Sequence, residues 1–137
     1  MTARHPLVRL ETFALIGIGG FAGANLRLFA TGIVPEVPGV LLVNALGSFV
    51  LGFLAYEAEY ADLLDRRSRL VFTTGFLSSL TTYSTFAVQA SLAAEPWLLG
   101  AIVVGNYGFG FGGVLAGRAL ARWITTGIRA TAGGETA

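Results

Sequence analysis

The sequence contains no cysteine, a single histidine (His5) and no lysine, and only 12% of its residues are charged. Without cysteine the chain has no disulfide framework, thiolate nucleophile or thiolate metal site. One histidine near the N-terminus also excludes a histidine-based metal site or a catalytic triad. The formal net charge of +1 gives no reason to expect a nucleic-acid partner. These absences make an enzyme the weakest interpretation.

Apolar residues dominate what is present. Hydrophobic residues make up 54% of the 137 residues, and the mean hydropathy is +0.69. Soluble domains carry about 25% charged residues, roughly twice the share found here. Glycine is also frequent, with 19 residues, which suits closely packed membrane helices. The composition therefore predicts an all-α membrane protein that forms one compact unit.

Charge-poor stretches long enough to cross about 30 Å of hydrocarbon occur four times in the chain. They predict four transmembrane helices within one domain over residues 12–124. Residues 1–11 and 125–137 are predicted to be tails outside the membrane. The first and third links between helices are short, whereas the middle link is long and strongly charged. The predicted spans are residues 12–34, 39–56, 70–94 and 96–117.

The arginines are distributed unevenly between the two sides of the predicted bundle. Both tails and the middle link lie on one side, and the two short links on the other side contain no basic residue. By the positive-inside rule, both termini are predicted to face the cytoplasm across the cell membrane. The arginines on that side are Arg4, Arg9, Arg66, Arg67, Arg69, Arg118, Arg122 and Arg129.

Three polar residues inside the spans each have two possible roles, because an unpaired polar group in hydrocarbon costs several kcal/mol. Arg27, toward the outer end of the first span, is either an interfacial anchor or a positive charge that attracts an anion to a vestibule. Asn44, with Ser48 one turn later on the same face, either forms an interhelical hydrogen bond or lines a pathway. Asn106, in the glycine-rich fourth span, carries the same two alternatives.

The strongest polar signal lies in the third span, where six serines and threonines besides Tyr83 fall between Gly75 and Phe86. Hydroxyl side chains bond freed backbone groups, so they tolerate a helix that is broken at mid-membrane and buried in protein. Carbonyl groups at such breaks coordinate cations, and N–H groups meet anions. The alternative is an intact helix whose hydroxyls bond their own carbonyls, and composition does not separate the two.

These motifs, in this order, resemble the Fluc/CrcB family of fluoride channels. The resemblance covers three spans, and the fourth fits only in its small residues. Tyr83 stands where the family usually has phenylalanine, and Ser78 where it commonly has glycine. The motifs are Gly19-Gly20-Phe21-Ala22-Gly23-Ala24 with Arg27, Val43-Asn44 with Gly47-Ser48-Phe49 and Gly52, and Thr74-Gly75-Phe76 through Thr81-Thr82-Tyr83-Ser84-Thr85-Phe86.

The resemblance implies an antiparallel dimer of four-span subunits, with two narrow pores that export fluoride passively. It also implies a structural sodium ion at the dimer centre, held by the backbone carbonyls of Ser78 and Thr81 in a broken third helix. The fluoride pathway is then expected to contain the asparagines, the aromatic pair and nearby hydroxyls, with Arg27 at the vestibule. These pathway residues are Asn44, Tyr83, Ser84, Thr85, Phe86 and Asn106.

Alternatives remain for the assembly and for the function. The partner in the dimer is either an inverted copy or an oppositely inserted paralogue, and the one-sided arginines favour the paralogue. A non-conducting or half-active subunit of a heterodimeric channel is a second functional reading. A small drug/proton antiporter is less favoured, because that mechanism needs a carboxylate inside the membrane and Glu11 lies only at the edge of a span.

Overall fold

The computed structural model describes residues 6–61 and 64–134, with side chains over residues 7–61 and 64–127. Residues 1–5 and 135–137 of the predicted tails lie outside the described residues. Arg4 and the side chain of Arg129 are therefore not described. The elements in order are α1 (Pro6–Ile33), α2 (Glu36–Tyr56), the π-helical η1 (Glu57–Ala61), α3 (Arg66–Leu70), the π-helical η2 (Val71–Leu77), α4 (Ser78–Leu80), α5 (Tyr83–Ser91) and α6 (Pro96–Gly134).

Three helical stretches are long and apolar enough to cross a membrane: Leu7–Ile33, Glu36–Ala61 and Pro96–Gly127. They cover the second and fourth predicted spans, and the first except for its last residue. The third predicted span is divided among α3, η2, α4 and α5, of which none alone is long enough to cross. The chain is therefore an all-α protein with three helices of membrane-spanning length among its described residues.

The observed helices extend beyond the limits that the charges predicted. α1 begins at Pro6 rather than at residue 12, and α6 continues to Gly134 rather than ending at residue 117. Charged residues mark where a helix leaves hydrocarbon, but arginine and glutamate are good helix formers and do not end it. α2 begins at Glu36, earlier than predicted, because Pro38 falls in the first turn, where no N–H group is needed.

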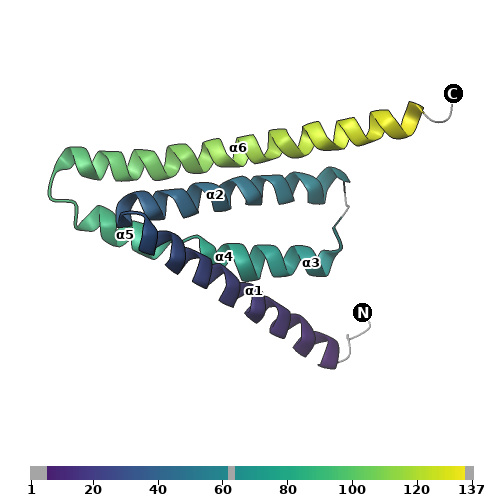
Figure 1. Cartoon of the computed structure of the whole chain (residues 1–137), viewed down its shortest axis with the longest axis horizontal. Coiled ribbons are helices and arrows are strands. Elements are labelled where there is room, and N and C mark those ends of the chain that lie inside the picture. The colour runs from purple at the N-terminus through teal and green to yellow at the C-terminus, as the bar shows by residue number, and fades with distance from the viewer. Residues whose placement is uncertain (1–5, 62–63, 135–137) are drawn as a thin grey trace.

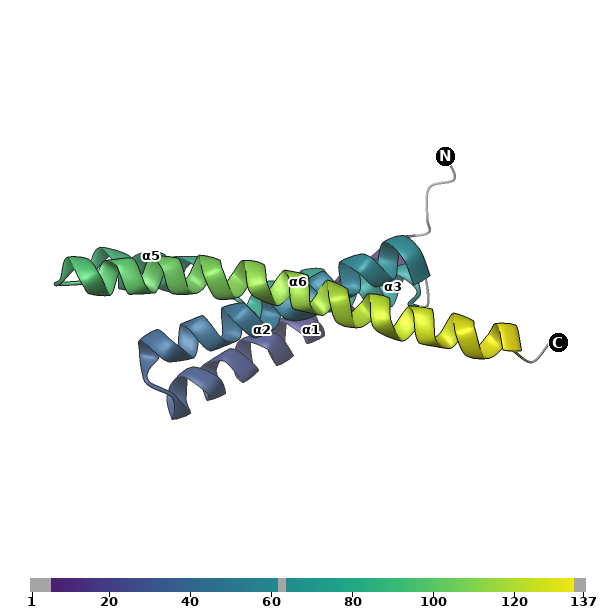
Figure 2. The same ribbon diagram turned by 90° about the horizontal axis from the view of Figure 1, so that it is seen from above.

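Glycines bring the helices into close contact. α2 and α6 cross at an angle (Figure 2), and a Cβ added at Gly117 would overlap the Phe49 carbonyl of α2. On the other side, a Cβ added at Gly23 of α1 would overlap the Phe76 carbonyl of η2. Backbone-to-backbone packing of this kind is typical of membrane helices. The segment from α3 to α5 (residues 66–91), called the third segment below, is thus held beside α1, and α6 is held on α2.

The start of α1, η1, the start of α3 and the far end of α6 lie at one end of the molecule, opposite the α1–α2 and α5–α6 turns (Figure 1). η1 is joined to the residues at and before α3 by the buried carboxylate of Glu57, which accepts a 2.7 Å hydrogen bond from Leu64 N–H and lies 3.3 Å from the Arg69 guanidinium. Arg67 of α3 also forms a 2.6 Å ion pair with Glu11 of α1. Charged contacts therefore gather at this end.

Candidate functional site

The helical third segment is interrupted at Thr81 and Thr82. α4 ends at Leu80, and both threonines are extended, with ψ of 155° at Thr81 and φ of −146° at Thr82. α5 then begins at Tyr83 with Thr82 as its N-cap, because the Thr82 hydroxyl oxygen accepts a 3.2 Å hydrogen bond from Thr85 N–H. Thr82 is buried, so its remaining backbone groups need partners from elsewhere in the fold.

Asn44 of α2 supplies those partners. Its Oδ1 accepts a 2.8 Å hydrogen bond from Thr82 N–H, and its Nδ2 donates to the Thr82 carbonyl at 3.1 Å. An extended residue presents its own N–H and C=O groups in one direction, as in a hydrogen-bonded pair of antiparallel strands. A side-chain amide offers the complementary donor and acceptor, so Asn44 takes the place of a facing strand.

The second amide hydrogen of Asn44 is donated to Oδ1 of Asn106 on α6, at 3.0 Å. Asn106 in turn donates from Nδ2 to the Ile102 carbonyl of its own helix, also at 3.0 Å. This network joins the third segment, α2 and α6, and it engages both amide hydrogens of Asn44. The interhelical hydrogen bond, one of the two roles left open for each asparagine, is therefore present for both.

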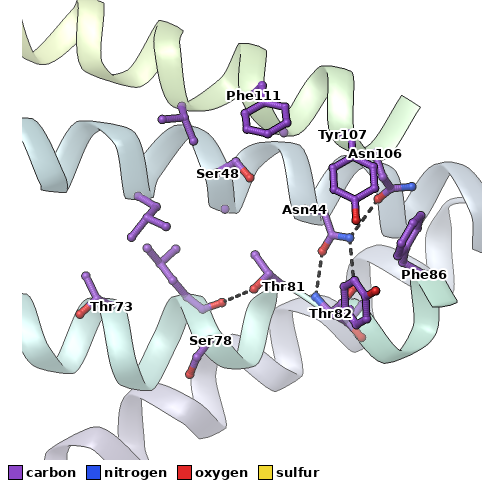
Figure 3. Close-up of a pocket in the computed structure, with 16 residues that line it drawn as sticks. Asn44, Ser48, Thr73, Ser78, Thr81, Thr82, Phe86, Asn106, Tyr107 and Phe111 are labelled. Atoms are coloured by element: carbon purple, nitrogen blue, oxygen red, sulfur yellow. Dashed lines mark hydrogen bonds between the residues drawn. The ribbon is translucent and has the colours of Figure 1, made fainter. Parts of the chain in front are cut away.

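A pocket of about 500 Å³ lies beside this network, between α2, the η2–α5 segment and α6 (Figure 3). Six of the predicted site residues line it, whereas Arg27, Ser84 and Thr85 do not. Arg27 is half-buried on α1, and Ser84 is exposed on the first turn of α5. The lining residues are Asn44, Gly47, Ser48, Leu51, Thr73, Leu77, Ser78, Thr81, Thr82, Tyr83, Phe86, Asn106, Tyr107, Gly110, Phe111 and Val114.

Four aromatic rings follow one another along the pocket. The centroids of Tyr83 and Phe86 are 5.6 Å apart, and Phe86 meets Tyr107 at 5.9 Å with the ring planes at 89°. Tyr107 and Phe111 continue the row at 6.4 Å. Perpendicular rings place the positive edge of one against the negative face of the other. Phe86 is buried, and its edge contact with Tyr107 joins the predicted aromatic pair to α6, where Tyr107 and Phe111 are stacked.

The backbone at Ser78 and Thr81 fits the predicted cation ligands in its chemistry. In a continuous helix the N–H group of Thr82 would be directed at the Ser78 carbonyl, but here it donates to Asn44. Thr81, the residue after α4, has a carbonyl that is also outside a regular helix. Freed carbonyls at unwound helices are ligands for sodium. Two carbonyls are too few to surround a cation, so a cation site here would need further ligands from outside these two residues.

Tyr107 and Phe111 line the pocket, but the sequence reasoning did not assign them to the site. They follow Asn106 by one and five residues, so they lie on the same side of α6 as Gly110 and Val114. Helical spacing counted from Asn106 is the signal that identifies this side. The hydroxyl of Ser48, one turn beyond Asn44, also lines the pocket.

The long apolar helices, with a mainly apolar pocket between them that also contains amides and hydroxyls, define an all-α, multi-pass membrane protein. Residues 14–118 match the family of CrcB-like proteins (camphor resistance, CrcB). The chain belongs to this family.

Curated relatives agree with this assignment. The chain is 50% identical over 127 residues to the fluoride-specific ion channel FluC 1 of Haloarcula marismortui, covering 93% of this chain and 98% of the relative. It is 46% identical over 115 residues to FluC 1 of Natronomonas pharaonis, covering 80% and 93%. It is 46% identical over 94 residues to FluC 2 of Methanosarcina mazei, covering 68% and 75%. These relatives are named as ion channels and not as enzymes.

Proposed function

We propose that this chain is a subunit of a fluoride-selective channel that lowers cytoplasmic fluoride by passive export. The observation that carries the proposal is the pocket at the interruption of the third segment, whose described lining residues include amides, hydroxyls and ring edges but no charged side chain. The names of the relatives point to the same ion. Those names do not favour a non-conducting subunit, and a neutral lining does not suit proton-coupled antiport.

Fluoride is small and strongly hydrated, so a narrow passage has to replace its water with hydrogen-bond donors and positive ring edges. Tyr83, Phe86 and Tyr107 provide ring edges, and hydroxyls near Asn44 provide polar groups. Larger halides are excluded by width. Because hydrogen fluoride enters cells as a neutral molecule and ionises inside, a negative-inside membrane potential drives the anion outward without an energy source in the protein.

In the proposed topology, α3, η2, α4 and α5 together form a fourth crossing, with the interruption at the middle of the membrane. From Arg66 to Ser91 this segment measures roughly 39 Å at 1.5 Å per residue, enough to cross the hydrocarbon. Arg67 pairs with Glu11 near the start of α1, and Arg118 lies 5.8 Å over the ring of Tyr56 at the end of α2, so basic residues gather toward the end of the molecule where α1 starts, which supports cytoplasmic termini in the cell membrane.

The proposed channel is an antiparallel dimer. Large apolar side chains on α1, such as Phe21 and Leu28, are 73% and 71% exposed, so lipid or a second subunit has to cover them. A second, inverted subunit would bring its own carbonyls to those of Ser78 and Thr81 and so complete a site for a structural sodium ion. That ion would supply positive charge between the two interrupted segments. The partner is an inverted copy or an oppositely inserted paralogue, and relatives numbered 1 and 2 support the paralogue.

The test is fluoride efflux from liposomes that contain the purified chain alone, and then the chain with an adjacent paralogue. We expect fluoride efflux in at least one case, with chloride retained in parallel liposomes. Efflux from the chain alone would show that an obligate heterodimer is wrong. Silence in both preparations, with folded protein in the membrane, would contradict the proposed function.

A further inference from the structure

Ser48 lies on α2 one helical turn beyond Asn44, on the side of the helix that lines the pocket (Figure 3). Residues four apart on a helix have their Cβ atoms about 6 Å apart. An ion that leaves the neighbourhood of Asn44 toward the end of α2 would therefore reach Ser48 next. This part of the pocket can bind an anion only where one of its groups presents a hydrogen.

The serine and threonine hydroxyls that line the pocket on η2, on α4 and at Thr81 are already engaged as donors. Thr73 Oγ1 donates to the Arg69 carbonyl at 2.9 Å, Thr81 Oγ1 donates to the Leu77 carbonyl at 3.0 Å, and the Ser78 hydroxyl donates to the Thr74 carbonyl. A hydroxyl whose hydrogen is engaged presents only its oxygen lone pairs, which repel an anion.

The Ser48 hydroxyl differs, because it forms no hydrogen bond within residues 7–61 and 64–127. Serine in a helix commonly donates to the carbonyl four residues earlier, but this hydroxyl is not engaged in that way. Both amide hydrogens of Asn44 are meanwhile held by Thr82 and Asn106. Ser48 therefore keeps a hydrogen for the pocket where Asn44 does not.

Gly110 of α6 faces Ser48 and leaves room beside the hydroxyl. A Cβ added at Gly110 would meet only Ser48 Oγ, at 3.7 Å, which is an ordinary van der Waals distance. The site thus consists of a half-buried hydroxyl on one helix and an open glycine on the next, within the pocket. Fluoride, as a compact anion that accepts strong O–H hydrogen bonds, fits this arrangement.

We infer that the Ser48 hydroxyl is a hydrogen-bond donor that contacts fluoride in the middle of the pocket, in a position that the engaged amide of Asn44 does not fill. This inference rests on the proposed function. It makes Ser48, opposite Gly110, a residue that determines the rate of fluoride passage.

The test measures fluoride efflux from liposomes in whichever assembly conducts with the unmodified chain. Ser48→Ala is expected to lower the efflux rate by about tenfold or more, because a hydrogen bond to a charged group is lost. Ser91→Ala is the matched control, since Ser91 lies outside the pocket and its hydroxyl donates to the Val88 carbonyl at 2.9 Å. Its efflux is expected to equal that of the unmodified chain.

A second variant returns the hydroxyl from the opposite helix. Adding Gly110→Ser to Ser48→Ala is expected to restore most of the efflux, whereas adding Gly110→Ala, which brings a methyl group alone, is not. Normal efflux in Ser48→Ala would overturn the role of Ser48 and leave the channel function standing. Rescue by Gly110→Ala would also overturn it, because shape and not the hydroxyl would be responsible. A silent unmodified protein would overturn both this inference and the proposed function.

Discussion

Exchanging Asn44 for aspartate tests whether its amide holds the interrupted segment in place. The carboxylate of Asn44→Asp can still accept from Thr82 N–H, but it has no hydrogen for the Thr82 carbonyl or for Asn106, which lie 3.1 and 3.0 Å from Nδ2. Two hydrogen bonds are lost and two oxygens are left facing a negative charge. We expect the free energy of unfolding to fall by about 2–4 kcal/mol.

Asn106→Asp is the matched comparison, because it makes the same chemical change one hydrogen bond away. Its carboxylate still accepts from Asn44 and loses only the bond to the Ile102 carbonyl, so the expected cost is about 1 kcal/mol. Both side chains are half-buried, so the cost of introducing a charge is similar in the two variants. The assay is unfolding of the detergent-solubilised protein. Equal losses in the two variants, or a larger loss in Asn106→Asp, would refute the role assigned to Asn44.

Three further outcomes are expected. Gly23→Ala should lower the free energy of unfolding by about 1–3 kcal/mol, and with it the Tm, because the added methyl overlaps a carbonyl of η2. Gly17→Ala is the control and should leave the Tm unchanged, because the space around Gly17 is open. Phe86→Ile should depress fluoride efflux while the protein stays folded, and normal efflux would remove Phe86 from the pathway. The Ser68 hydroxyl and N–H groups at the start of α3 lower the pKa of Asp65, so this carboxylate stabilises the fold at neutral pH and loses that effect as the pH falls through its folded pKa. The difference in Tm between the unmodified chain and Asp65→Asn should therefore shrink toward acid, and a constant difference would contradict the role of the cap.

The presence of long apolar helices could be predicted, because a charge-free run of sufficient length allows few other structures. Their ends could not be predicted in the same way. Charged residues set the ends of the predicted spans, yet α1 extends back past Arg9 and Glu11, and α6 extends past Arg118 and Arg122. A helix ends where capping or a breaking residue ends it, and no proline follows position 96.

Part of the site could also be anticipated from residue type and motif. Asn44, Tyr83, Phe86 and Asn106 were selected from the sequence, and the structure brings all four to one pocket. Their partners could not be derived, because a contact between α2 and α6 depends on how the two helices are rotated and shifted against each other. The pairing of Asn44 with the backbone of Thr82 is of this kind.

The π-helical turns lay beyond prediction for a different reason. η2 directs the N–H group of Ser78 to the Thr73 carbonyl five residues earlier, a shift of one residue from the α-helical pattern. Local propensity does not encode such a shift. It is associated here with tight packing of Gly75 against α1, where an added Cβ would lie 2.6 Å from the Ile16 carbonyl oxygen.

The pairing of Asn44 with Thr82 joins residues 38 positions apart along the chain. The bend is thus imposed by a neighbour, and a peptide cut from Arg66 to Ser91, placed alone in micelles, would straighten into a rod. Since Asn44 comes before Thr82 in the chain, this pairing can form only after both α2 and the segment through Thr82 have been synthesised.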